Sequence, residues 1–543
     1  MRIWTGRAGS GKTTAILREI AALSEKGEGR QILLVPELNS HLMERRLAAA
    51  THNHGARTAE VLTFSRLADR VFSEVGGLAQ QMLTPAGQLL TLQEAARRVQ
   101  GGLSAWKGLA DKPELLQEAL RLIDECKTCA VAPETLFAAA EESEDAVLAE
   151  KLSDLAQILT AYERLCDESL PDPRDRLTHL RDRLAESHTL DGAAVYLDGF
   201  LGFTAQESAV VDAMLAAGVP LSAAVTCDTD YPEIFLTGCK TVQKLTRMAK
   251  HHNQTVERIE LGESKVARPA GLAALERESL LPVRTPQESA DGVRLYEAAS
   301  PFDECEHAAA YIRRKVRDEG ARCRDFVVAA RDIEPYSAFL AMAMARYDIP
   351  VFLAEKPDLL SRPPMALVTN ALEAVRNYFR YEDLFSCLKT GLAGLDWDEI
   401  DKLENYVLTW NIRGGAWERE WTEHPDGYGL SIDENAKAQL AELNTLRKRA
   451  IAPFSALREA LAGEQPAGDC VRALYAFLLA VDAPQRMTDR AAGHEQAGRL
   501  QLADEYRQLW EILVSAMEQF AWVCGDMPLT LDRFAQLFRL VLG

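Results

Sequence analysis

Gly6-Arg-Ala-Gly-Ser-Gly-Lys-Thr13 is the stretch that decides the fold of this 543-residue chain. It fits the phosphate-binding loop pattern G-x-x-x-x-G-K-[ST] at every fixed position. A short extended run precedes it at residues 2–5, and residues 14–23 follow with the apolar spacing of a helix. Strand, glycine-rich loop and helix in this order predict an α/β fold built on a parallel sheet.

The loop predicts a nucleotide site and gives its residues roles. Its glycines let backbone N–H groups point at phosphate oxygens, and the N-terminus of the following helix adds the positive end of a dipole. Lys12 is expected to reach the β- and γ-phosphates of ATP, and the Thr13 hydroxyl to ligate Mg²⁺. The candidate nucleotide-binding residues are Gly6, Arg7, Ala8, Gly9, Ser10, Gly11, Lys12, Thr13 and Thr14.

More strands and helices alternate with this unit along the chain. Short apolar runs at residues 31–37, 61–65, 194–200 and 221–226 indicate buried parallel strands. With the first strand they predict a doubly wound parallel sheet of the RecA-like, P-loop type. Ligands bind such sheets at the carboxyl ends of the strands, where the loops 36–40 and 63–66 are expected to accompany the phosphate loop.

Asp198 ends the returning strand at 194–200 and predicts a second part of the nucleotide site. An apolar strand that ends in Asp downstream of a phosphate loop is the Walker B arrangement, in which the carboxylate holds Mg²⁺ opposite Thr13. The catalytic Glu that usually follows is missing, because residue 199 is Gly. Gln206 or Glu207 could substitute for it, or could simply begin the next helix.

The pattern predicts two sheet lobes, each with a helical insertion. Strands expected at 293–298, 325–331 and 349–353 belong to the second lobe, and Arg331 at the end of one of them is a candidate catalytic sensor of the γ-phosphate or a surface ion pair. Because the pattern stops in mid-helix, we expect the N-terminal part of a longer protein. The expected parts are a first lobe at 1–83 and 193–262, a helical insertion at 84–192, a linker at 263–291, the start of the second lobe at 292–356, and a second helical insertion at 357–543.

Composition is that of an ordinary globular protein, with 47% hydrophobic and 26% charged residues and no apolar run long enough for a membrane span. The net charge of −20 argues against a surface covered in nucleic-acid contacts, although residues 1–100 carry a net +4 and leave room for a local basic channel.

Ten cysteines without a framework suit a reducing cytoplasm. Cys126 and Cys129 form a C-x-x-C with no second pair at zinc spacing, which favours ordinary thiols over a metal site.

Two interrupted α/β lobes with these motifs resemble the superfamily 1 DNA helicases, and more closely the AddB subunits of bacterial AddAB-type helicase–nucleases. The stretches that carry the resemblance are GRAGSGKT (6–13), ILLVPE (32–37), VLTFSRLADRVFSEVGG (61–77), VYLDGFLGFTAQE (195–207), FVVAARDIEPY (326–336), IPVFLAEK (349–356) and LKTGLAGLDWDEIDKLENYVLTW (388–410). They occur in the family's order across some 400 residues.

The resemblance implies a heterodimer with an AddA-type subunit that processes double-strand DNA ends for recombinational repair and recognises the sequence Chi. It implies ATP and Mg²⁺ here, and an iron–sulfur cluster only in a nuclease domain beyond this chain. The implied contacts with single-stranded DNA are Ser40, Thr63, Phe64 and Arg66, of which Phe64 has core packing as its alternative. Leu38 stands where the family commonly has Gln.

Two other functions remain open from sequence. G-x-x-G-S-G-K-T-T is also typical of small-molecule P-loop kinases, which would not need a second α/β lobe. A DNA-recognition scaffold with a structural, non-hydrolysed nucleotide is the other alternative, and Gly199 favours it over a vigorous ATPase.

Overall fold

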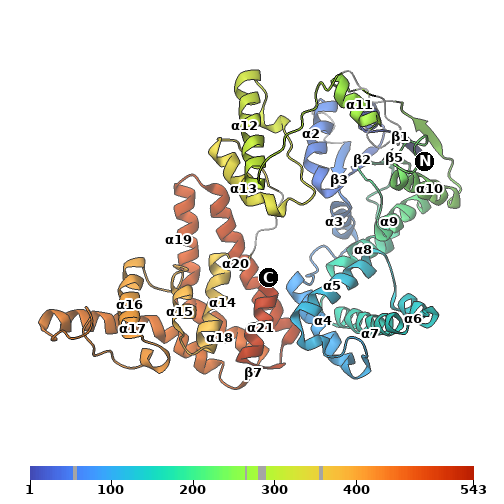
Figure 1. Ribbon diagram of the computed structural model, residues 1–543. Coiled ribbons are helices and arrows are strands. Elements are labelled where there is room, and N and C mark those ends of the chain that lie inside the picture. Colours follow the sequence, from blue (N-terminus) through green and yellow to red (C-terminus); the bar gives the residue numbers. More distant parts are fainter. Residues whose placement is uncertain (53–57, 263–265, 279–285, 287–288, 354–358, 543) are drawn as a thin grey trace. The chain divides into compact units, whose positions relative to one another are not determined.

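The computed structural model describes residues 1–52, 58–262, 266–278, 286, 289–353 and 359–542. The chain forms two compact units (Figure 1). The larger combines Met1–Glu263 with Leu359–Gly543, and the smaller is Ser264–Asp358.

A six-stranded parallel sheet forms the centre of the N-terminal part; the sequence predicts a parallel sheet and five of its strands, but not β6. The order of the strands is β3-β2-β4-β5-β1-β6. β1, which carries the phosphate loop, therefore lies between β5 and β6, the two strands that come last in the sequence of this sheet. β4, which follows the long helical stretch, pairs with β2 and β5 in the middle of the sheet. The strands are β1 (Arg2–Gly6), β2 (Arg30–Leu34), β3 (Ala59–Leu62), β4 (Ala193–Leu197), β5 (Leu221–Thr226) and β6 (Glu257–Glu260).

Helices cover both faces of the sheet because its strands are apolar on both sides. One face packs with Ile16, Ile20 and Met43 of α1 and α2, and the other packs with residues of α3, α9 and α10 such as Leu67 and Val210. Figure 1 shows α2 and α3 beside β2 and β3. These helices are α1 (Lys12–Lys26), α2 (Ser40–Ala50), α3 (Phe64–Val75), α9 (Ala205–Ala216) and α10 (Leu236–His251).

The stretch between β3 and β4 is helical, and its described residues form no strand, as predicted. Its core gathers apolar residues such as Leu92, Ile158 and Tyr162. The helices are α4 (Pro85–Val99), α5 (Pro113–Thr128), α6 (Pro133–Glu142), α7 (Ala146–Glu168) and α8 (Arg176–Arg183).

The C-terminal part of the larger unit is a second helical block with a large core that contains Trp417, Phe454 and Phe520. It packs on the first block through α20, α21 and α4, where the backbone N–H of Thr84 donates to Gln519 Oε1 at 2.8 Å. The helices are α14 (Pro363–Arg376), α15 (Tyr381–Leu388), α16 (Trp397–Trp410), α17 (Glu434–Ala460), α18 (Ala467–Ala480), α19 (Ala483–Gln496), α20 (Leu500–Cys524) and α21 (Leu531–Leu542); a small antiparallel pair, β7 (Glu464–Pro466) with β8 (Pro528–Thr530), joins them.

The smaller unit differs from expectation, because the strands expected at 293–298, 325–331 and 349–353 are not formed among the described residues. A strand exists only with a hydrogen-bonded partner, and no other described segment pairs with these. The unit consists of α11 (Ala270–Glu278), α12 (Pro301–Glu319) and α13 (Glu334–Arg346). α11 lies inside the predicted linker 263–291, of which 263–265, 279–285 and 287–288 lie outside the described residues.

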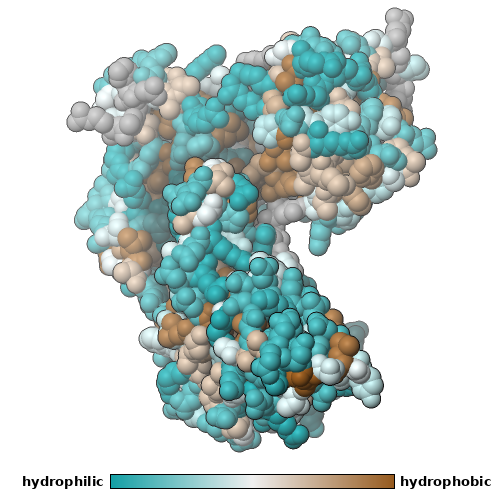
Figure 2. Space-filling view, turned by 90° about the vertical axis from the view of Figure 1, so that its left-hand side faces the viewer, coloured by the Kyte–Doolittle hydropathy of each residue, from teal (hydrophilic) through white to brown (hydrophobic). Residues whose placement is uncertain are grey.

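The surface is mainly polar where Figure 2 shows it, with apolar residues in separate patches. Among the described helices, none has the length and apolar character needed to cross a membrane.

Candidate nucleotide and nucleic-acid site

The phosphate loop joins the end of β1 to the start of α1, in the predicted strand–loop–helix arrangement. Lys12 begins α1 and is buried, and its Nζ donates to the carbonyl oxygens of Gly6 at 2.7 Å and Arg7 at 2.8 Å. Burial lowers the pKa of Lys12, and the charge of Asp198 offsets only part of that effect. The ammonium group is therefore held inside the loop by carbonyl groups of the loop itself.

Ser10 adds an unusual polar atom to this loop. Its Oγ is buried and makes no hydrogen bond with any described residue. A buried hydroxyl without a partner is costly, so this atom is available to an oxygen-rich group bound within the loop.

Asp198 lies directly after β4 and faces the start of α1, so the two predicted metal residues meet. A hydrogen bond links its carboxylate to Thr13. Burial raises the pKa of Asp198 above its ordinary value, although that hydrogen bond and the charge of Lys12 act in the other direction. One carboxylate and one hydroxyl are a suitable protein contribution for Mg²⁺, which keeps several waters and takes further oxygens from phosphates.

No general base follows Asp198. Gly199 has a φ of +84°, and Glu207 is used in a capping box at the start of α9, where its Oε2 accepts from the backbone N–H of Thr204 at 2.8 Å. Gln206 Nε2 donates to the carbonyl of Arg174 at 2.8 Å. Both residues that could have replaced the missing Glu are thus engaged in holding the fold.

Arg7 has partners that the sequence did not reveal. Its Nε lies 2.5 Å from Asp228 Oδ2, and its guanidinium lies over the ring of Tyr231 at 4.9 Å and that of Phe235 at 5.8 Å. The loop after β5 therefore fixes the second residue of the phosphate loop. The only advance signal was the position of Asp228 just beyond a strand.

A groove of about 500 Å³ opens at the carboxyl ends of β2, β3 and β4. Thr63 and Phe64 line it, whereas Ser40 and Arg66 do not. Leu38, 95% exposed, also lines it and was not among the predicted contacts.

The predicted DNA contacts have different surroundings. Thr63 is buried and caps α3, accepting from the backbone N–H of Arg66 at 3.2 Å, and Phe64 is only 5% exposed, with its ring edge-on to Phe200 at 5.6 Å. Phe64 therefore belongs to the core here, which was the alternative considered for it. Ser40 begins α2 and donates to the carbonyl of Glu37, while Arg66 is half exposed and pairs with Glu44.

Arg331 belongs to the smaller unit, where it is exposed and lines a cavity of about 420 Å³ with Glu304 and Tyr336. It does not end a strand, because residues 326–330 have no strand pairing. Its role as a γ-phosphate sensor stays a prediction.

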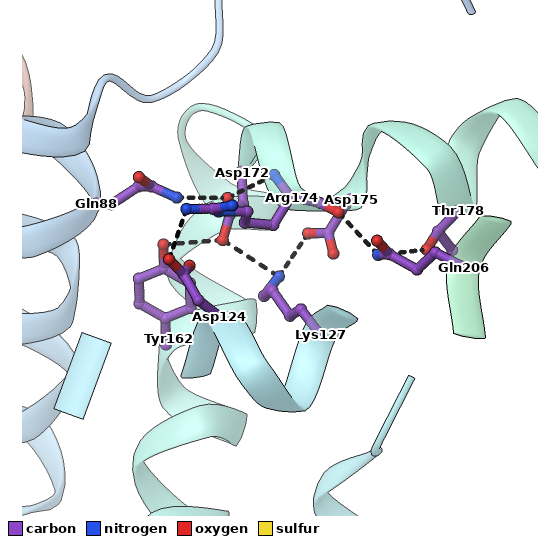
Figure 3. Close-up of polar contacts among 9 residues, drawn as sticks. All are labelled: Gln88, Asp124, Lys127, Tyr162, Asp172, Arg174, Asp175, Thr178 and Gln206. Carbon is purple, nitrogen blue, oxygen red and sulfur yellow. Dashed lines mark hydrogen bonds and ion pairs between the residues drawn. The ribbon is translucent and has the colours of Figure 1, made fainter. Parts of the chain in front are cut away.

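A buried polar cluster ties α9 to the first helical block (Figure 3). Lys127 Nζ lies 3.4 Å from Asp172 and 2.6 Å from Asp175, and the side chains of Lys127 and Asp172 are 4% and 0% exposed. Tyr162 Oη and Gln88 Nε2 both donate to Asp172, at 3.0 and 2.8 Å. The buried carboxylate is thus satisfied by three different helices.

The same cluster is connected to the helix beside Asp198 through one short segment, residues 172–174. Asp172 accepts from the backbone N–H of Arg174, whose carbonyl accepts in turn from Gln206. Gln206 lies in α9, the helix that follows Asp198. Hydrogen bonds through Arg174 and Asp172 therefore link α9, the helix that follows Asp198, to α4, α5 and α7.

The cysteines of the C-x-x-C motif, Cys126 and Cys129, are free thiols. Over the described residues there is no group of three or more His, Cys, Asp or Glu that could hold a metal ion.

The family model described as "ADDB, N-terminal" matches residues 3–276. The B subunit of the ATP-dependent helicase/deoxyribonuclease of Acetivibrio thermocellus is 32% identical over 100% of this chain and 49% of its own length. The proteins of the same description from Thermoanaerobacter sp. (strain X514) and Clostridioides difficile (strain 630) are 30% and 29% identical, over 99% of this chain and 48% of theirs. The chain thus spans about half the length of the curated relatives it matches.

Proposed function

The chain belongs to the AddB family, and we propose that it is the ATP-binding, helicase-like part of a subunit that processes double-strand DNA ends for recombinational repair. It would work as a heterodimer with an AddA-type helicase–nuclease subunit, bind single-stranded DNA and recognise Chi. Membership of this family argues against the alternative of a small-molecule kinase.

The observation that carries the proposal is the meeting of Lys12, Thr13 and Asp198 at the carboxyl edge of one parallel sheet. Bound MgATP would supply the phosphoanhydride whose binding or cleavage powers the subunit. Lys12 would exchange the carbonyls of Gly6 and Arg7 for phosphate oxygens, and Thr13 and Asp198 would hold the Mg²⁺. The partnerless Ser10 hydroxyl would then gain an acceptor.

A nucleotide-bound scaffold with slow turnover is the second candidate, and one observation favours it. Residue 199 is Gly, and Gln206 and Glu207 are both used in structural hydrogen bonds, so none of the three can orient a water as it stands. We therefore expect tight binding with slow hydrolysis, with the main motor activity in the partner subunit.

DNA binding is proposed for the groove at the ends of β2, β3 and β4. Exposed Leu38 and, beside the groove, Arg66 and Ser40 would contact a single strand, while the buried residues Thr63 and Phe64 would form the wall of the groove. A basic side chain beside an apolar groove is the usual combination for a single strand, whose bases need an apolar face and whose phosphates need a cation.

For the domains we propose a first RecA-like lobe at 1–83 with 193–262 and a second lobe that begins at 292–356. The helical blocks 84–192 and 357–543 would be insertions in these lobes, and Arg331 would act from the second lobe. This assignment is supported by the family and by the first sheet.

Nucleotide binding and phosphate release by the 543-residue chain would test the proposal. Lys12→Ala should abolish binding of a fluorescent ATP analogue, whereas Lys26→Ala, an exposed lysine at the other end of α1, should leave it unchanged. Phosphate release that stays slow with single-stranded DNA would support the scaffold, and brisk DNA-stimulated release would support a motor. Equal binding by both variants would overturn the site.

A further inference from the structure

Two thiols outside the proposed catalytic residues lie in contact beside the phosphate loop. Cys227 follows β5, Cys239 lies in the first turn of α10, and both are free, with their Sγ atoms 3.1 Å apart. In the part of the chain that the structure describes, the C-x-x-C cysteines show no such sulfur–sulfur contact.

The fold itself brings the two sulfurs together. A β-carbon on Gly238 would lie only 2.0 Å from the carbonyl oxygen of Thr226, so the start of α10 packs directly against the end of β5. Cys239 and Cys227 are the next residues along each element. Their contact is therefore fixed by the packing of a helix on a strand.

The two thiols differ in access. Cys227 is 3% exposed, and its pKa is raised to about 12 by burial and by the hydrogen bond with Cys239. Cys239 is only partly buried. A small oxidant can therefore reach Cys239, with Cys227 behind it as the second thiol.

The loop between these cysteines holds the phosphate loop. Asp228, Tyr231 and Phe235 all lie between residues 227 and 239 and all contact Arg7. Cys227 also forms an isolated backbone bridge with Gly6. A bond between the two sulfurs would close this loop at both ends.

We propose that Cys227 and Cys239 are a redox-sensitive modification site that hydrogen peroxide converts to a reversible disulfide, which fixes the Arg7-binding loop against the phosphate loop. The disulfide rests on the geometry alone, whereas its effect on nucleotide binding rests on the proposed function.

The chemistry balances in two steps. Cys239 gives up its proton, its thiolate attacks one oxygen of the peroxide and the O–O bond breaks, so that a sulfenic acid forms and the departing hydroxide takes up the released proton as the first water. The Cys227 sulfur then attacks the sulfenic sulfur and the S–O bond breaks, while the Cys227 proton and the departing hydroxide form water. Two thiols and one peroxide thus give one disulfide and two waters, and an added dithiol reverses the bond by exchange.

The first test maps disulfides in the 543-residue chain after brief exposure to peroxide. Peptide mass spectrometry should find a 227–239 disulfide before Cys126 or Cys129 is oxidised, and a dithiol should remove it. In Cys227→Ser, a sulfenic-acid trap should label Cys239 instead. Free, alkylatable thiols at 227 and 239 while Cys126 and Cys129 are already oxidised would overturn the proposal.

The second test asks whether the loop responds. Chymotrypsin cleavage after Tyr231 and Phe235 should slow on oxidation of the wild type and stay unchanged in Cys227→Ser. Nucleotide affinity should differ about fivefold between oxidised and reduced wild type, a coupling of ordinary allosteric size, and not at all in Cys227→Ser. Equal nucleotide affinity and equal cleavage in both redox states would overturn the coupling between the disulfide and the phosphate loop. A disulfide that forms in a chain that binds no nucleotide in either redox state would support the thiol site and refute the proposed function.

Discussion

A β-carbon on Gly199 would lie 3.2 Å from Nδ2 of Asn39 and 3.4 Å from Cδ of Pro36. The φ of +84° at this position is one that side chains other than glycine rarely adopt. Any side chain at residue 199 would therefore press on the loop after β2, which would have to shift slightly. The left-handed backbone at residue 199 also disfavours a glutamate there.

Gly199→Ala should destabilise the protein more than Gly218→Ala. Both residues have a left-handed φ, but a β-carbon on Gly218 would meet nothing within 4 Å. The control should cost about 1–2 kcal/mol from backbone strain alone, and Gly199→Ala should cost measurably more, as read from urea unfolding. Equal losses would show that Asn39 and Pro36 yield without cost.

Lys127→Met should lower the free energy of unfolding by about 3–5 kcal/mol, because it leaves the carboxylate of Asp172 buried without its cation. Lys151→Met, at an exposed position of α7, serves as the control and should change the stability little. Thermal and urea unfolding of the two variants provide the comparison. A loss below about 1 kcal/mol for Lys127→Met would mean that Tyr162 and Gln88 satisfy Asp172 by themselves.

The stabilising effect of Lys127 should disappear at alkaline pH. Burial lowers its pKa, but attraction to Asp175 and Asp172 outweighs burial and leaves the pKa raised. A raised folded-state pKa gives stability that is complete below the unfolded value of about 10.4 and is lost as pH rises through the folded value. The difference in unfolding free energy between wild type and Lys127→Met should therefore stay constant from neutral pH to about 10.4 and shrink as the pH rises further.

Arg66→Ala should weaken binding of single-stranded DNA and reduce the slope of log affinity against log salt by about 0.7, the contribution of one phosphate contact. Arg70, one turn further along α3 and paired with Glu60, is the matched control. Fluorescence anisotropy over a salt series measures both variants. Identical slopes for the two would remove Arg66 from the proposed path of the strand.

Phe64→Ala should lower the stability of the fold, whereas Leu38→Ala should weaken the binding of single-stranded DNA. Phe64 is 5% exposed, so its removal should cost about 3–5 kcal/mol. Leu38 is 95% exposed, so its removal should leave the melting temperature unchanged while weakening single-stranded DNA binding. A Leu38→Ala variant that binds DNA as the wild type does would refute a role for the groove.

The sequence predicted the first five strands because four are uninterrupted apolar runs and one precedes a phosphate loop. It missed β6 (Glu257–Glu260), which is charged at every position except Ile259 and is mostly exposed at the edge of the sheet. An edge strand needs only backbone pairing on one side, so no apolar pattern marks it. The strands expected at 293–298, 325–331 and 349–353 had the apolar pattern but have no pairing partner among the described residues.

The candidate site was predictable only where a local motif specifies it. Lys12 and Thr13 at the start of α1 do lie near Asp198 after β4, and their role in nucleotide binding stays a prediction. The pairing of Arg7 with Asp228 and that of Lys127 with Asp172 depend on packing between distant segments, for which single residues give no signal.

The order of the strands also has a consequence for synthesis on the ribosome. β1 pairs with β5 and β6, so the backbone of residue 2 can pair only after residues 222 and 257 have been synthesised. At about 5–20 residues per second, residue 222 is made roughly 10 to 45 s after residue 2. During that interval β1 has neither of its pairing partners, so this strand is made well before the two strands that hold it in the sheet.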